Sequence, residues 1–199
     1  VSAFAVPFLQ RTHGMSVAEA GASFALASSL GAVTPLALGM LADRMARGGL
    51  HRSLWFSGAT ALLVLGAGAV MLLAPTRSAG VAGMVAWQML VVGITAPNYA
   101  ALLSITPPPV RGTVTAILML GTNLIGLGGA PTLVGTLSDA FGGADGLRRA
   151  MLVDLAFSLP AALLFAHAGW QVSRVGTAPA DGTAQILDVG TLGSKQEKA

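Results

Sequence analysis

The sequence of 199 residues contains no cysteine and few charged residues. Without cysteine it can form neither a disulfide nor a thiolate metal site. Charged residues make up 10% of the chain, against about 25% in a typical soluble domain. Hydrophobic residues make up 54%, and the mean hydropathy is +0.74. Because such a chain cannot cover itself with polar groups, the lipid bilayer is its expected surroundings.

Signatures of catalysis and of cofactor binding are also missing. The sequence has no H-E-x-x-H, G-x-S-x-G or Walker motif, and its glycine-rich stretch 121–129 lacks the spacing of a dinucleotide-binding loop. The net charge of +3 is small, and the basic residues lie between apolar blocks, which does not favour nucleic-acid binding. The sequence therefore predicts neither an enzyme nor a cofactor.

What the chain does contain is a series of long apolar blocks between charged residues. Four blocks carry no charge, and a fifth carries only Asp154; they are residues 20–42, 53–76, 78–110, 112–138 and 150–173. A helix needs roughly 20 apolar residues to cross the bilayer, so each block predicts a membrane-spanning helix. The apolar opening before Arg11 is too short to span, and it predicts a sixth, truncated helix at the start of a fragment.

Local signals indicate where these helices begin and end. Ser16 and Glu19 have the spacing of a capping box at a helix start. The run Pro107–Pro109 is expected to end the fourth helix, and Pro97 to kink it. Residues 1–173 are predicted to form the helical bundle, and the polar residues 174–199 a disordered cytoplasmic tail.

The basic residues predict the orientation of the chain. One side would hold Arg44, Arg47, Arg52, Arg111, Arg174, Lys195 and Lys198, and the other Arg11, Arg77, Arg148 and Arg149. By the positive-inside rule, the first side and the C-terminus are cytoplasmic. The expected location is the plasma membrane, or inner membrane of a bacterium.

A short motif occurs twice, as PLALGMLAD at residues 35–43 and as PTLVGTLSD at residues 131–139. It would end the second helix with Asp43 on one side of the membrane and the fifth with Asp139 on the other. Two three-helix repeats of opposite orientation follow from this placement, an arrangement found in secondary transporters. The alternative is a chance match, because Gly, Leu and Pro are common in this sequence.

The stretch GMLADRMARGG at residues 39–49 resembles the loop signature of the major facilitator superfamily, with Ala46 where that family usually has glycine. Residues 107–143 resemble the fifth helix of the C-terminal half of such carriers, nearest to the spinster-like or organic-anion branch. The resemblance implies half of a twelve-helix carrier and, as a partner, a missing N-terminal six-helix bundle. It also implies that the first, second, fourth and fifth helices line the substrate path.

The candidate site residues form two groups. A gate that stabilises one state of the transport cycle would contain Gly39, Asp43, Arg44, Arg47, Arg111 and Asp139, with an Asp43–Arg111 contact joining the second and fifth helices. The alternative is a basic loop with a solvated aspartate. A neutral cavity wall would contain Gln88, Asn98, Tyr99, Thr122 and Asn123. Hydrogen bonds between helices are the alternative role of those side chains.

Asp154 lies within a predicted span, where a carboxylate is costly and is a candidate proton-coupling group. The alternative is an ion pair with Arg148 or Arg149 at the interface. The glycines at 121, 126, 128 and 129 are expected to permit close helix packing. Together these features predict a symporter or antiporter for a small organic solute. A non-transporting assembly partner or receptor, or an inactive truncated product, are the alternatives.

Overall fold

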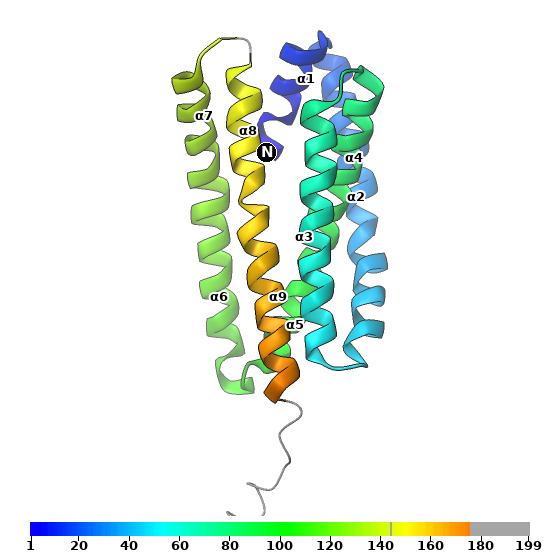
Figure 1. Ribbon diagram of the computed structural model, residues 1–199, viewed down its shortest axis with the longest axis vertical. Coiled ribbons are helices and arrows are strands. Elements are labelled where there is room, and N and C mark those ends of the chain that lie inside the picture. The colour runs from blue at the N-terminus through cyan, green and yellow to red at the C-terminus, as the bar shows by residue number, and fades with distance from the viewer. Residues whose placement is uncertain (144, 176–199) are drawn as a thin grey trace, which may run out of the picture.

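The computed structural model describes residues 1–143 and 145–175, and every regular element in these ranges is a helix (Figure 1). The first crossing contains a short turn η1 and helix α1, and the second and third contain α2 and α3. The fourth is divided into α4 and α5, the fifth into η2, α6, η3 and α7, and the sixth into α8 and α9. The bounds are η1 Ser2–Phe4, α1 Ala5–His13, α2 Val17–Ala46, α3 Leu50–Leu73, α4 Arg77–Gly93, α5 Thr95–Ile105, η2 Pro108–Val110, α6 Arg111–Gly121, η3 Thr122–Gly129, α7 Ala130–Phe141, α8 Gly146–Ala156 and α9 Ser158–Val175.

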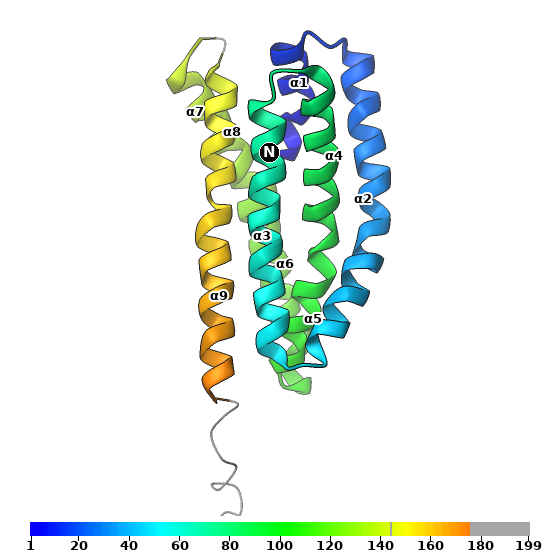
Figure 2. The ribbon, with the colours of Figure 1, turned by 45° about the vertical axis from the view of Figure 1, so that its right-hand side comes forward.

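Five of the six crossings are long and apolar enough to span a membrane, as the charge-free blocks predicted. They cover Val17–Ala46, Leu50–Leu73, Arg77–Ile105, Pro108–Phe141 and Gly146–Arg174. The remaining helix, α1, has nine residues and is the short first helix that the sequence indicated. Successive crossings run in opposite directions along the long axis of the molecule (Figures 1 and 2).

The start of α2 is fixed by the predicted capping box. The backbone N–H of Glu19 donates to Ser16 Oγ at 3.2 Å, and the N–H of Ser16 donates to Glu19 Oε2 at 2.9 Å. These bonds satisfy two backbone donors that a helix start otherwise leaves unpaired. Glu19 also forms an ion pair of 2.8 Å with Arg77 at the start of α4. One carboxylate therefore both begins α2 and joins it to α4.

Prolines divide two of the long crossings. The boundary between α4 and α5 falls at Ile94, three residues before Pro97, and the boundary between α8 and α9 falls at Phe157, three residues before Pro160. Proline lacks the N–H that would bond four residues back, and its ring crowds that turn. The predicted kink at Pro97 is confirmed. The predicted stop is confirmed as well, since α5 ends at Ile105 and Pro108 opens the turn η2.

The best-packed part of the molecule lies between α1, α3, α4 and α8. Phe8, Met71, Met84 and Met151 are fully buried there. Gly83 lets α4 approach the backbone of α3, because a Cβ added at Gly83 would lie 2.8 Å from Met71 Cα. Close approach at small residues is the usual way in which helices pack in a membrane.

The fifth crossing is different, because only 6% of its most apolar stretch is buried within the molecule. Its upper part, α7, packs against α8, whereas α6 and η3 mainly contact their own neighbours in the chain. Large side chains therefore remain exposed, among them Leu120 at 66% and Ile125 at 72%.

The glycines of this crossing do not pack as expected. A Cβ added at Gly121, Gly126 or Gly128 would meet no atom within 4 Å, and one at Gly129 would meet only Leu124 O at 3.8 Å. The prediction of close helix packing at these four glycines is wrong within the described residues, because no described helix covers this face. The stretch Thr122–Gly129 is also π-helical rather than α-helical.

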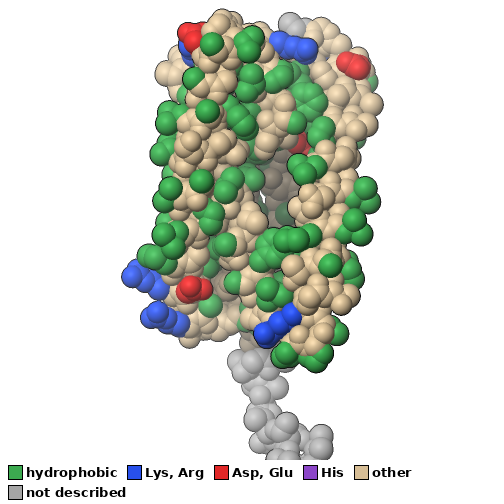
Figure 3. All heavy atoms as spheres, turned by 180° about the vertical axis from the view of Figure 1, so that it is seen from behind, with side chains coloured by type: hydrophobic (Ala, Val, Ile, Leu, Met, Phe, Trp, Pro, Cys, Tyr) green, Lys and Arg blue, Asp and Glu red, His purple; other side chains and the backbone are tan. Residues whose placement is uncertain are grey.

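Charged side chains gather at the two ends of the molecule (Figure 3). The end formed by the last turn of α2, the start of α3, the start of α6 and the last turn of α9 carries five arginines and one aspartate; they are Arg44, Arg47, Arg52, Arg111, Arg174 and Asp43. We call it the basic end. The opposite end carries four arginines and three carboxylates; they are Arg11, Arg77, Arg148, Arg149, Glu19, Asp139 and Asp145.

The helix α9 continues through Arg174 to Val175, so the bundle extends two residues beyond its predicted boundary. The rest of the predicted tail, residues 176–199, lies outside the described residues. The repeated motif ends near opposite ends of the molecule, with Asp43 in the last turn of α2 and Asp139 in the last turn of α7 (Figure 1). That placement is the one expected of inverted repeats.

Candidate functional site

A cavity of about 390 Å³ lies between α5, the α6–η3 junction and α9. Its walls include four hydrogen-bonding side chains, Thr95, Asn98, Tyr99 and Thr122. The apolar side chains Ile94, Leu102, Leu118 and Phe165 complete it. A cavity of this size, mostly apolar with a few convergent polar groups, has the general character of a small-molecule site. We call it the α5–α6 cavity.

Asn98 is held in this cavity by a contact between helices. Ser57 on α3 is 2% exposed, and its hydroxyl donates to Asn98 Oδ1 at 2.7 Å. An asparagine whose carbonyl is already engaged still offers its amide N–H groups. The amide is thus both oriented by α3 and able to donate to a molecule in the cavity.

Tyr99 and Thr122 supply the other predicted groups. Tyr99, the only tyrosine in the sequence, is half-buried on α5, next to Asn98. The hydroxyl of Thr122 donates to the carbonyl of Leu118 at 2.8 Å, which satisfies its proton within its own helix. Its oxygen can still accept a hydrogen bond. The cavity therefore presents donors and acceptors without a formal charge.

The other two predicted wall residues lie elsewhere. Gln88 packs against Gly31 of α2, and its buried Oε1 has no hydrogen-bond partner in the described part of the chain. Asn123 is exposed, and its Nδ2 donates to the carbonyl of Met119 at 2.8 Å. Neither lines the α5–α6 cavity. Gln88 lies on the face of α4 that packs against α2, and Asn123 lies one residue around the helix from Thr122.

Asp43, Arg44, Arg47 and Arg111 of the predicted gate lie at the basic end, but Asp43 and Arg111 do not form the expected ion pair. Asp43 lines a cavity of about 190 Å³ with Ser104 of α5, and Arg111 Nε donates to the carbonyl of Thr106 at 3.0 Å. Within the described ranges, Asp43 and Arg111 make no ion pair with each other. The reason is that α2 packs against α3, α4 and α5, whereas α6 mainly contacts η2 and η3.

The remaining gate candidates make few contacts with other helices. Arg44 and Arg47 are exposed, and a Cβ added at Gly39 would meet nothing within 4 Å. Asp139 lies at the other end and lines a cavity of about 180 Å³ with Arg11, Ser138 and Leu147. Asp43, Arg44 and Arg47 are thus exposed in this structure, and the gate stays a prediction.

Asp154 does not pair with either neighbouring arginine. Within the described residues, Arg148 pairs with Asp145 at 3.3 Å. Asp145 is three residues from Arg148, a spacing at which helical side chains meet, while Asp154 is six residues away. The expected interfacial pair with Arg148 or Arg149 is therefore not formed in this structure.

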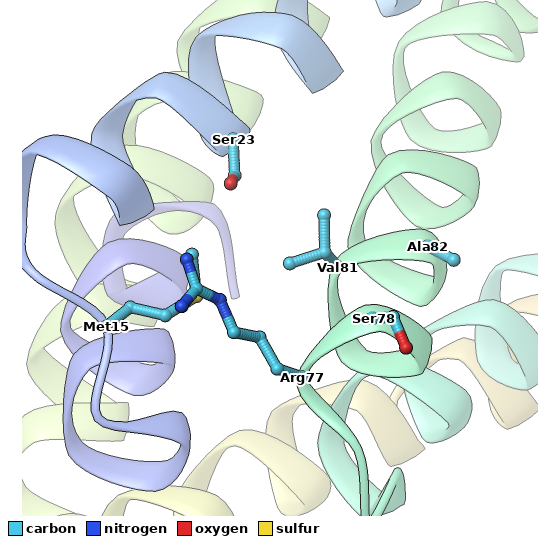
Figure 4. Close-up of a pocket in the computed structure, with 6 residues that line it drawn as sticks. All are labelled: Met15, Ser23, Arg77, Ser78, Val81 and Ala82. Atoms are coloured by element: carbon cyan, nitrogen blue, oxygen red, sulfur yellow. The ribbon is translucent and has the colours of Figure 1, made fainter.

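A larger and more open cavity of about 750 Å³ lies between α1, α2 and α4 at the end opposite the basic end (Figure 4). Met15, Ser23, Arg77 and Val81 are among its lining residues. The guanidinium of Arg77 extends from the start of α4 toward α2 (Figure 4). Because that cation is already paired with Glu19, the cavity offers no uncompensated charge to a ligand.

The sequence did not point to Ser57, which orients Asn98 from behind the cavity wall, or to Phe165, which is part of that wall. Ser57 lies near the start of the apolar block 53–76, and the only signal in the sequence is that a serine in a membrane helix needs a hydrogen-bond partner. Phe165 belongs to the last helix, which the family resemblance places at the periphery. The described cavity thus has its walls on the fourth, fifth and sixth crossings, with no contribution from the first two.

The chain is 31% identical over 157 residues to an "MFS-type efflux pump" of Mycolicibacterium smegmatis (strain ATCC 700084 / mc(2)155), where MFS stands for the major facilitator superfamily. The match covers 77% of this chain and 36% of the relative, so the chain spans about a third of that protein's length. No family model matches the chain, and no solved structure matches it. With five helices long and apolar enough to cross a bilayer, the chain is an integral multi-pass membrane protein that is similar, over most of its length, to a pump of the major facilitator type.

Proposed function

We propose that this chain is one helical bundle of a secondary carrier that moves a small organic solute across the membrane by alternating access. The α5–α6 cavity forms part of the substrate path, and a second bundle supplies the opposite wall. The observation that carries the proposal is a cavity of about 390 Å³ with oriented, uncharged polar groups in a chain similar to an efflux pump. Such a site binds weakly enough to release its solute on either side.

The chemistry of the cavity indicates which solutes fit. It has no ionisable wall group other than the phenol of Tyr99, and half of its named wall residues are apolar. Desolvating a charged solute there would be costly, because no wall group would compensate the charge. We infer that the solute is neutral or carries its charge on a part that stays outside this cavity.

The proposed location is the plasma membrane, or inner membrane of a bacterium, with the basic end in the cytoplasm. Within the described residues, the five arginines and one aspartate at that end support this orientation. Transport would be coupled to an ion gradient, and Asp154 is the candidate proton-coupling group. Its position inside the sixth crossing, where its side chain is 18% exposed, supports that assignment.

The test is transport by the full natural polypeptide expressed in cells. Cells are loaded with Nile red, an uncharged dye, as a probe, and its loss is followed with and without a protonophore. We expect energy-dependent loss of dye that Asn98→Ala slows by about fivefold or more, because removing a buried hydrogen-bond partner costs about 1–3 kcal/mol. Tyr99→Phe should slow it as well.

The control variant is Ser173→Ala, whose hydroxyl bonds to the carbonyl of Trp170 on its own helix, outside the cavity. It should transport as the wild type does. A wild-type protein that moves none of a panel of neutral and cationic dyes would contradict transport. Equal rates for Asn98→Ala, Tyr99→Phe and wild type would remove this cavity from the path.

A further inference from the structure

The outer surface between α3 and α9 carries a second, almost wholly apolar hollow of about 480 Å³. Trp55, Ala59 and Leu62 of α3 form one wall, and Leu159, Leu163 and Ala166 of α9 form the other. We call it the α3–α9 groove. It is separate from the α5–α6 cavity, with which it shares none of its lining residues.

The floor of the groove is closed by small residues. A Cβ added at Gly58 would lie 3.2 Å from the carbonyl oxygen of Ala162, so the two helices are nearly in contact there. The walls stand out on either side, with Leu62 52% exposed and Leu163 70% exposed. The result is a channel along the helices whose open side faces the surroundings, which in a bilayer are acyl chains.

The groove ends at a group of aromatic side chains. The indole of Trp55 packs against Gly169 of α9, where an added Cβ would lie 2.6 Å from Trp55 Nε1. The ring of His51 lies edge-on to Trp55, with ring centroids 5.5 Å apart. Trp170 follows Gly169 and is 46% exposed. Indole rings favour the level of the lipid headgroups, so this group marks where the apolar layer ends.

Positive charge lies immediately beyond these rings. The guanidinium carbon of Arg174 sits 3.5 Å above the centroid of the Trp170 ring, which fixes that cation beside the indole. Arg52 follows His51 at the start of α3. Among residues 1–143 and 145–175, the carboxylate at this end is Asp43 in the last turn of α2, and it lines the cavity between α2, α3 and α5 rather than the groove.

We propose that the α3–α9 groove is a binding site for an anionic phospholipid. One acyl chain lies along the groove, and the phosphate lies beyond Trp55, near Arg174 and the start of α3. The occupant follows from the order of the surfaces: an apolar channel, then indole rings, then cations, which matches the order of chain, glycerol region and phosphate in a phospholipid. Basic sites between membrane helices bind anionic headgroups in this way. The site is independent of the proposed transport function.

The test uses tryptophan fluorescence of the full chain in vesicles. Part of the lipid is replaced by brominated phosphatidylglycerol or, separately, by brominated phosphatidylcholine, since bromine quenches nearby indoles. Trp55 and Trp170 report on the site, because the third tryptophan, Trp87, is only 5% exposed. We expect stronger quenching by the phosphatidylglycerol at the same mole fraction.

Two kinds of variant distinguish the contribution of the positive charge to lipid binding from that of the apolar groove. Arg174→Gln should lower the preference for phosphatidylglycerol by about fivefold, the contribution expected of one cation at a membrane surface. Arg11→Gln, which removes a charge at the opposite end, should leave the preference unchanged. Ala166→Leu should fill the groove and reduce quenching by both lipids, and Ala59→Leu does the same from the other wall if the first variant fails to fold.

Each outcome decides the proposal. Equal quenching by the two lipids in the wild type would overturn it, because the groove would then hold ordinary bilayer lipid. A preference that survives Arg174→Gln, or that Arg11→Gln abolishes equally, would also overturn it. Loss of the preference on adding inorganic phosphate would show a simple anion site instead. A preference lost only with Arg174→Gln and the groove-filling variants would support the proposal.

Discussion

At the scale of single residues, His13 is the titratable group whose surroundings are most distinctive outside the spanning segments. It ends α1, and its Nε2 is buried without a hydrogen-bond partner in the described ranges. A Cβ added at Gly80 of α4 would lie 2.7 Å from that nitrogen, so the ring is enclosed by the neighbouring helix. Burial, together with Arg148 and Arg77 nearby, lowers the pKa of His13 below its usual 6.5. The folded protein therefore favours the neutral ring.

This preference predicts a dependence of stability on pH. The unfolded chain takes up a proton at His13 near pH 6.5, whereas the folded chain resists it, so stability falls as the pH drops through 6.5 and below. His13→Gln should flatten that part of the profile. The measurement is the thermal midpoint of the protein in detergent from pH 8 to about pH 5.

The matched control is His167→Gln, because His167 is exposed at the basic end. It should leave the pH profile as it is in the wild type. If His13→Gln and wild type lose stability in parallel as the pH falls, another group is responsible.

At the scale of elements, the glycines differ in what they face. Gly83 lies against the backbone of α3, with Val70 C 3.0 Å from the position of an added Cβ. Gly126 in η3 faces open space. Both are glycines within membrane helices, and only the packing distinguishes them. Gly83 should be intolerant of a side chain, while Gly126 should accept one.

Gly83→Ala should lower the free energy of unfolding by about 1–3 kcal/mol, the usual cost of overpacking a close contact. Gly126→Ala should leave stability unchanged or raise it slightly, since alanine favours a helix by up to about 1 kcal/mol over glycine. Thermal midpoints of the two variants in the same detergent check this. Equal losses for both would mean that the face of η3 is covered by another helix.

The elements themselves were largely predictable from the sequence. The charge-free blocks, the capping box at Ser16 and the prolines at 97 and 107–109 are local signals, and each acts within a turn or two of its own position. The partner of each helix face was not predictable, because spacing of small residues shows where a helix can approach another, not whether one is present. The same reason explains why the glycines of η3 were misread.

At the scale of the whole molecule, α6 and η3 expose a long apolar face, and the chain is similar to 36% of the length of the efflux pump. In the carrier proposed above, that face would pack against the second bundle. The candidate site was only partly predictable from the sequence. Asn98, Tyr99 and Thr122 meet in one cavity, while Gln88 and Asn123 do not, since helix rotation cannot be read from composition.

The gate hypothesis is a prediction about this whole assembly. In the full-length carrier, Asp43→Asn should slow dye efflux by about tenfold, because a charge-assisted hydrogen bond that forms in one state of the cycle contributes about 1.5–3 kcal/mol. Asp145→Asn, which alters the exposed pair with Arg148 at the other end, should have no effect. Unchanged efflux with Asp43→Asn would favour the solvated loop.

The π-helical stretch Thr122–Gly129 sets the angle between the side chains of α6 and those of α7 around the axis of the fifth crossing. Its hydrogen bonds close around one more residue than those of an α-helix, so each residue advances by a smaller angle around the axis. Conversion of this stretch to an α-helix would turn α7 relative to α6 about their common axis, while the two ends stayed nearly in line. The side chains of α7 would then point in a different direction from those of α6 around the axis of the crossing.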